Sequence, residues 1–209
     1  LYKFFDREGN TLVLRPDFTP SVSRACATYF NPEKEVVSLC YTGNTFINNS
    51  SFRGRLKETT QMGVERMGDD SAEADAEILA MTVECLLAAG LTEFQVSVGQ
   101  VDYYKAILAQ TGMSQEEEEE LRELISQKNY FGVEELVKNK NMDKSLARVL
   151  SQLPQMFGST EVLEKAKSLT DNPQALKAVA RLEEIYELLK VYGYEKYVTF
   201  DFAMLSKYH

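Results

Sequence analysis

Histidine is almost missing from this chain: the single His among its 209 residues is the last one, His209. We therefore predict neither a catalytic triad that uses His as its base nor a metal site. Cysteine is scarce too. Cys26, Cys40 and Cys85 are odd in number and follow no C-x-x-C spacing, so we interpret them as buried, reduced thiols.

Long apolar runs, targeting signals and nucleotide-binding loops are absent from the sequence as well. No stretch is long and apolar enough to cross a membrane, and none has the pattern of a secretory signal. Neither a Walker loop nor a dinucleotide-binding fingerprint occurs. We therefore predict a cytoplasmic protein that has no cofactor and does not bind a membrane. Both ends have the pattern of strands, which suggests a core truncated at both ends.

Basic residues are outnumbered: 23 Lys and Arg stand against 32 Asp and Glu, which gives a formal net charge of −9. Proteins that bind nucleic acid usually carry a basic patch or stripe, so this balance argues against a nucleic-acid partner. Hydrophobic residues make up 44% of the sequence. This proportion and the length are enough for a globular core with a small subdomain.

Residues 36–66 predict a long β-hairpin arm. One strand enters over 36–46, a polar turn at Asn48–Gly54 reverses the chain, and a second strand leaves over 55–66. Side chains on a strand point alternately to its two faces. One face of the second strand therefore carries Lys57, Thr59, Gln61 and Glu65, and the other carries Leu56, Met62 and Val64. The polar face is either a solvated surface or the floor of a ligand site.

The elements around the arm predict an α+β fold with a mostly antiparallel sheet. They are strands at 2–5 and 11–14, a helix capped by Thr19, a helix from Ser71 to Gly90 and a strand at 94–98.

The segment 101–194 differs, because no convincing strand is visible in it. Ser114 and Glu117 form a capping box, and Asn172-Pro173 opens a helix that Gly193 ends. Further helices are predicted at 130–139, 143–153 and 160–169. A strand at 197–202 follows and is expected to rejoin the first sheet. We predict a core of residues 1–100 and 195–209 that is interrupted by an all-helical insertion, residues 101–194.

Four polar residues are the candidates for a binding site: Asp17, Thr19, Gln61 and Glu65. A carboxylate in a largely buried sheet is costly unless a cation or a hydrogen-bond donor meets it. The ammonium group of a ligand is one such partner. A structural salt bridge to Arg15 or Lys57 is the alternative.

Several motifs resemble class II histidyl-tRNA synthetases. LRPDFT at 14–19 is similar to their LRPE-x-T signature, and GRLKETTQMGVERMG at 54–68 is similar to the end of motif 2 and the Q-x-G-x-E that follows it. DDSAEADAEILAM at 69–81 and FDFAMLSKYH at 200–209 also match in order. The resemblance covers nearly the whole chain and implies a class II aminoacyl-tRNA synthetase-like antiparallel sheet, flanked by helices, in a protein that is usually dimeric.

The chain departs from the synthetases at two arginines. The resemblance places Ile47 where motif 2 carries an Arg that holds the ATP α-phosphate, and Ser206 where a later signature carries a second Arg. Neither side chain can make charge-assisted, bidentate bonds to phosphate. Losing one such transition-state donor typically costs about 3–4 kcal/mol, so the resemblance implies that the chain has no catalytic residue at these positions.

The candidate site is retained, however. Asp17, Thr19, Gln61 and Glu65 match the residues with which synthetases grip the amino group of histidine. This combination resembles the regulatory subunit of ATP phosphoribosyltransferase, as do KFFDREGNTLVLRPDFTP at 3–20 and the ending SKYH. The family resemblance implies a noncatalytic homodimer within a hetero-oligomer. Its partner would be a short-form catalytic subunit at the first step of histidine biosynthesis, and histidine the candidate feedback ligand.

Three alternatives stay open from the sequence. A divergent histidyl-tRNA synthetase is one, and a synthetase-like protein with another partner or effector is the second. The third concerns the site itself: histidine could instead be held at the interface with the partner.

Overall fold

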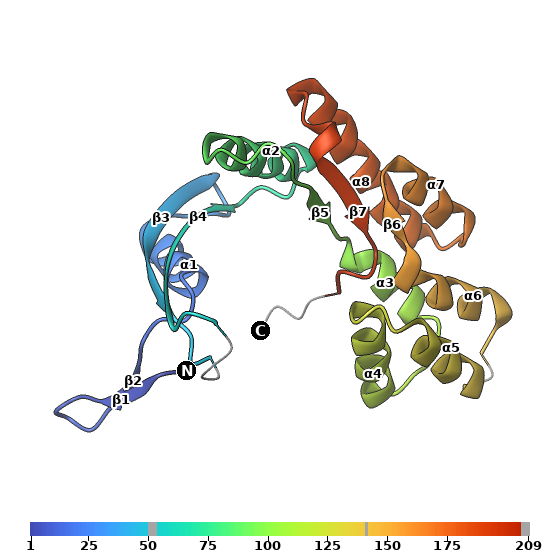
Figure 1. Ribbon diagram of the computed structural model, residues 1–209, viewed down its shortest axis with the longest axis horizontal. Coiled ribbons are helices and arrows are strands. Elements are labelled where there is room, and N and C mark those ends of the chain that lie inside the picture. The colour runs from blue at the N-terminus through green and yellow to red at the C-terminus, as the bar shows by residue number, and fades with distance from the viewer. Residues whose placement is uncertain (50–53, 141, 206–209) are drawn as a thin grey trace. The chain divides into compact units, whose positions relative to one another are not determined.

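The computed structural model describes residues 1–49, 54–140 and 142–205. The chain forms two compact units, Leu1–Asp70 (unit 1) and a second that begins at Ser71 (unit 2). These units divide the chain at a different place from the predicted boundaries of core and insertion. Figure 1 shows the elements of each unit.

Unit 1 begins with a small hairpin. Strands β1 (Lys3–Phe5) and β2 (Thr11–Val13) pair antiparallel, as the sequence predicts. The Asp6 carboxylate closes the turn because it accepts the backbone N–H groups of Glu8 and Asn10 and the Asn10 amide. The hydrogen bond from the Asn10 side chain is the main reason that the pKa of Asp6 is lowered.

Helix α1 (Thr19–Tyr29) follows, with Pro20 in its first turn. The prediction that Thr19 caps this helix is wrong. Phe18 occupies the N-cap position without a side-chain hydrogen bond, and Thr19 is the first helical residue. The reason is that the hydroxyl of Thr19 bonds to a residue far away in the sequence, which is described below.

The predicted arm is confirmed as the antiparallel pair β3 (Val37–Phe46) and β4 (Glu58–Met67). Part of its predicted turn, residues 50–53, lies outside the described residues. Strand β4 starts later than predicted, so Leu56 and Lys57 precede it. The register sets Tyr41 opposite Gly63 and Gly43 opposite Gln61. Gln61 and Glu65 share one face of the arm, and Met62, 76% exposed, points to the other.

Unit 2 contains a three-stranded sheet in the order β5-β7-β6, made of β5 (Val96–Val98), β7 (Val198–Asp201) and β6 (Phe157–Gly158). All four residues of the central strand β7 are buried. Strand β7 runs parallel to β5 and antiparallel to β6. The parallel pair arises because a long helical connection separates the two strands. Strand β6 was not predicted, since two residues are too short for a periodic pattern.

Seven α-helices in the described part of unit 2 share one hydrophobic cluster with this sheet, and Figure 1 shows their order along the chain. They are α2 (Ala72–Ala88), α3 (Val101–Leu108), α4 (Gln115–Ser126), α5 (Tyr130–Asn139), α6 (Lys144–Gln152), α7 (Thr160–Ser168) and α8 (Pro173–Tyr192). The 3₁₀ turns Leu153–Gln155 and Glu195–Tyr197 complete the chain of elements.

The predicted helix ends are confirmed at several positions. Ser71 accepts the N–H of Ala74, Ser114 and Glu117 form the capping box, and Gly193 ends α8 in the left-handed conformation. The segment 101–194 is helical apart from β6. Its helices share one hydrophobic cluster with α2, β5 and β7, and its separation as an inserted domain stays a prediction.

The cysteines differ from the prediction. Cys26 is buried in α1, but Cys40 and Cys85 are exposed. Cys40 lies on the exposed face of β3, together with Ser38 and Thr42. Among the described residues, no group of His, Cys, Asp and Glu is arranged to hold a metal ion. None of the described helices combines the length and apolar character that a membrane span requires.

Candidate functional site

Three of the four predicted site residues meet in unit 1. The Thr19 hydroxyl donates a hydrogen bond of 2.6 Å to Oε1 of Glu65, 46 residues further along the chain. The Asp17 carboxylate accepts the backbone N–H of Thr19 at 3.2 Å. The start of α1 and the strand β4 therefore bring two carboxylates and one hydroxyl together.

Gln61 lies on the same face of β4, four residues before Glu65. It is exposed, and its side chain makes no hydrogen bond within the described part of the chain. Its amide is therefore available as both a donor and an acceptor.

Two aromatic residues that the sequence reasoning missed complete the site. The rings of Phe18 and Tyr41 stack with their centroids 4.6 Å apart. Each ring lies over a glycine of the arm. A Cβ atom at Gly43 would lie 2.7 Å from Phe18, and one at Gly63 would lie 2.4 Å from the Tyr41 phenol oxygen. The two glycines, on opposite strands, are the signal that could have revealed these aromatic contacts.

The candidate site carries the negative charges of Asp17 and Glu65, and no ion pair neutralises them among the described residues. Burial raises the pKa of Tyr41, the charges of Glu65 and Asp17 raise it further, and the hydrogen bond with Thr19 opposes them. The phenol therefore stays neutral at physiological pH. The Arg15 guanidinium lies 4.6 Å from the centre of the Phe18 ring. Among the described residues, neither Arg15 nor Lys57 forms an ion pair with Asp17 or Glu65, so the structural salt bridge is not found.

Of the two positions at which the synthetases carry an arginine, the structure describes Ile47 but not Ser206. Ile47 follows β3, its backbone N–H donates to the carbonyl of Lys57 at 3.0 Å, and its side chain is 48% exposed. An aliphatic side chain there offers no donor for phosphate. Ser206 lies outside the described residues.

Two cations of unit 2 contact the segment just before Ser206: Arg122 of α4 and Lys128 of the turn between α4 and α5. Asp201, 7% exposed, receives a hydrogen bond of 2.8 Å from Nζ of Lys128. Arg122 of α4 donates to the carbonyl of Leu205 at 3.1 Å. Lys128 has a φ of 55°, and it is the one non-glycine residue with positive φ among those described.

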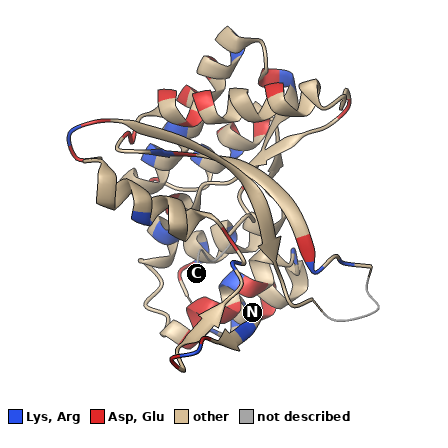
Figure 2. Cartoon of the chain, turned by 90° about the vertical axis from the view of Figure 1, so that its left-hand side faces the viewer, with Lys and Arg blue, Asp and Glu red and all other residues tan. Residues whose placement is uncertain are grey.

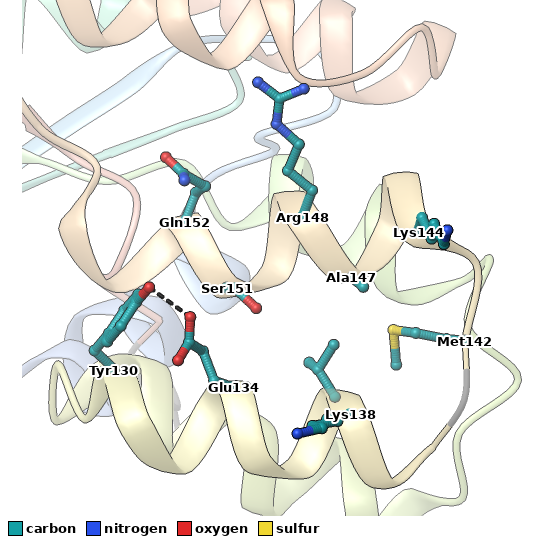
Figure 3. Close-up of a pocket in the computed structure, with 10 residues that line it drawn as sticks. Tyr130, Glu134, Lys138, Met142, Lys144, Ala147, Arg148, Ser151 and Gln152 are labelled. Atoms are coloured by element: carbon teal, nitrogen blue, oxygen red, sulfur yellow. Dashed lines mark hydrogen bonds between the residues drawn. The ribbon is translucent and has the colours of Figure 1, made fainter.

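Unit 2 also has a groove between α5 and α6, which Figure 3 shows. Its volume is about 600 Å³, and Val137, Met142 and Ala147 form its apolar part. Tyr130 and Glu134 are joined by a hydrogen bond of 2.5 Å at one end. Arg148 points away from α5 in this view. Figure 2 shows acidic and basic residues interspersed along the helices and strands. No pattern in the sequence predicts this groove.

Comparison with known proteins gives one family over the whole chain. Residues 1–209 match the family model described as histidyl-tRNA synthetase. The chain is 39% identical over 206 residues to the ATP phosphoribosyltransferase regulatory subunit of Acetivibrio thermocellus, and covers 49% of that protein. It is 38% identical to the regulatory subunit of Thermoanaerobacter pseudethanolicus, of which it covers 54%. Each alignment includes 99% of this chain. The chain thus spans about half the length of the curated relatives it matches.

Solved structures agree with the predicted fold. A regulatory subunit/histidyl-tRNA synthetase from Bacillus halodurans has a TM-score of 0.85 and 34% identity, over 97% of this chain and 53% of that one. The HisG:HisZ ATP phosphoribosyl transferase complex from Thermotoga maritima gives 0.72 at 24% identity, over 98% of this chain and 70% of that one. At that identity the likeness concerns the fold alone. The predicted α+β, class II synthetase-like fold is confirmed.

Proposed function

The chain belongs to the histidyl-tRNA synthetase family, and from this premise we propose that it is part of a noncatalytic regulatory subunit of ATP phosphoribosyltransferase. In this proposal it is needed for the activity of a short-form catalytic subunit in the first step of histidine biosynthesis, and it senses histidine. The similarity to named regulatory subunits supports this assignment.

The hydrogen bond between Thr19 and Glu65 carries the ligand part of the proposal. Because the Thr19 proton is committed to Glu65, the hydroxyl can act toward any further group only as an acceptor. Asp17 and Glu65 add two carboxylates with no ion-pair partner among the described residues. A cluster of acceptors with net negative charge suits an ammonium group. We propose that it binds the amino group of histidine.

The noncatalytic part of the proposal rests on Ile47 and on the alignment of Ser206. An adenylating site must neutralise the charge that develops on the transferring phosphate, and Ile47 has no group to do so. The alternative function is that of a divergent histidyl-tRNA synthetase, which the name of the matching family model favours.

Pyrophosphate exchange distinguishes these two functions. We expect the full-length protein to show no histidine-dependent exchange of pyrophosphate into ATP, whereas a histidyl-tRNA synthetase assayed beside it does. Exchange at the rate of that synthetase would establish the alternative. Titration calorimetry with histidine and with other amino acids tests the effector, since heat with another amino acid only would identify a different ligand.

The assembly belongs to the proposal as well. We propose a homodimer within a hetero-oligomer with the catalytic subunit, in analogy to the Thermotoga maritima complex. The mass of the full-length protein in solution, alone and with the catalytic subunit, tests this arrangement.

A further inference from the structure

The groove between α5 and α6 combines an apolar floor with a basic border (Figure 3). The floor is formed by Val137, Met142 and Ala147. Lys138, in the last turn of α5, and Lys144, the first residue of α6, belong to the border. The floor suits apolar side chains of another molecule, and Met142 can adapt to their shape because methionine is unbranched and flexible.

The cations of this border are not neutralised by the chain itself. Both lysines are exposed, and neither forms an ion pair within the described part of the chain, whereas the nearby Lys140 pairs with Glu117. Arg148, the third cation, points away from α5 and has no ion pair among the described residues either. Glu134 lies at the opposite end of the groove from the border lysine of α6, where it accepts a hydrogen bond from Tyr130. In a chain with a net charge of −9, the groove is a local concentration of positive charge.

This combination favours a protein segment as the occupant rather than a nucleic acid. A phosphate backbone needs cations but makes no use of an apolar floor. The acidic run Glu116–Glu120 also begins α4, which packs against α5, and would repel phosphates. A segment that carries carboxylates beside apolar side chains matches both the floor and the border.

We propose that the groove docks an acidic amphipathic segment of the catalytic subunit, with its carboxylates at Lys138 and Lys144 and its apolar side chains on the floor. The inference rests on the proposed function, because that function supplies the partner. It adds to that function a contact surface in unit 2, whereas the candidate histidine site lies in unit 1. Exposed charges at such a contact mainly speed association and select the partner.

The double variant Lys138→Glu/Lys144→Glu tests this contact, because it reverses both charges and keeps the apolar floor. The full-length protein is titrated into a short-form catalytic subunit, and the concentration that gives half-maximal stimulation is measured. We expect this concentration to rise on the order of tenfold, since two attractive contacts become repulsive. Added salt should raise it for the wild type but not for the variant, because salt screens exposed charges.

Lys165→Glu/Lys177→Glu is the matched control. It makes the same change of charge at exposed lysines of α7 and α8 that also form no ion pair among the described residues. We expect it to change the half-maximal concentration by less than about twofold. Equal effects of the two double variants would overturn the inference, because only net charge would then matter. Unchanged stimulation by the groove variant would overturn it directly.

The same measurements separate this inference from the proposed function. If the wild-type protein does not stimulate the catalytic subunit, the proposed function fails and the inference fails with it. If the groove variant has a lower mass than the wild type when each is alone in solution, the groove belongs to a contact between two copies of this chain, and the inference is wrong. Binding of tRNA by the wild type that the groove variant loses would likewise assign the groove to nucleic acid.

Thermal unfolding of each variant shows whether the fold is retained. Lys144→Glu alone repeats the test if the double variant is less stable, because a negative charge at the first residue of a helix is favourable for that helix. We expect this single variant to raise the half-maximal concentration about threefold, and an unchanged value in a folded protein would contradict the inference.

Discussion

Glu65→Ala is expected to reduce the affinity for histidine on the order of a hundredfold, because the ligand ammonium loses a charged acceptor. The substitution also frees the Thr19 hydroxyl from its 2.6 Å hydrogen bond, so the orientation of a second ligand contact is lost. Calorimetry on the full-length protein measures the change. In the assembled enzyme, the same variant should need correspondingly more histidine for feedback inhibition.

Glu58→Ala is the matched control for this experiment. Glu58 lies at the start of the same strand but on the opposite face, where its carboxylate accepts a hydrogen bond from Asn44 at 2.6 Å. We expect its affinity for histidine to equal that of the wild type. If Glu65→Ala retains both affinity and feedback, histidine binds elsewhere, and the interface with the catalytic subunit becomes the site to examine.

Lys128→Met is expected to lower the free energy of unfolding by about 1–3 kcal/mol, because it leaves the carboxylate of Asp201 without its cation. The side chain of Asp201 is 9% exposed and that of Lys128 is 51% exposed. Removing the exposed Lys128 and removing the buried Asp201 should therefore have different effects on stability. Asp201→Asn should cost less, since the released ammonium is free to reach water and the amide oxygen can still accept from Ala203. Urea unfolding of the variants measures both effects.

Lys128→Gly distinguishes the contribution of the Lys128 side chain to stability from that of its backbone conformation. Glycine adopts a φ of 55° without the steric cost of a Cβ, so this variant should be more stable than Lys128→Met by about 1 kcal/mol.

Lys105→Met is the control: it removes an exposed ion pair with Asp102, in which both side chains are 67% exposed, and should change the free energy of unfolding by less than about 0.5 kcal/mol. A larger loss in Asp201→Asn than in Lys128→Met would contradict this account of the pair.

Local rules of the sequence predicted most of the helices. The caps at Ser71, Ser114 and Asn172 depend only on residues within one turn, and so they can be found without knowledge of the fold. The arm was predictable for a similar reason, since its two strands are neighbours in the sequence and a polar turn separates them. Its start was misjudged by three residues, because Arg55, Leu56 and Lys57 continue the alternation of polar and apolar side chains into a segment that precedes the strand.

Features that depend on distant residues were not predictable in this way. Thr19 has the composition of a helix cap, and only Glu65, on a strand that the chain reaches later, explains why its hydroxyl is used otherwise. Strand β6 exists because β7 offers an edge to it. Lys128 occupies a backbone conformation usual for glycine, and its buried partner Asp201 is 73 residues away.

The candidate site was predicted in part, and through motifs rather than through periodicity. The resemblance named Asp17, Thr19, Gln61 and Glu65, and the structure places three of them in contact and the fourth on the same face. Tyr41 and Phe18 were missed, because aromatic residues in an arm have no distinctive spacing. Their role depends on the two glycines opposite them.

The most direct test of the central claim is the activity of a short-form ATP phosphoribosyltransferase measured with and without the full-length protein, and with increasing histidine. We predict that the catalytic subunit is stimulated by the protein and that histidine inhibits the combined activity. A catalytic subunit that is equally active with and without the protein would contradict the claim.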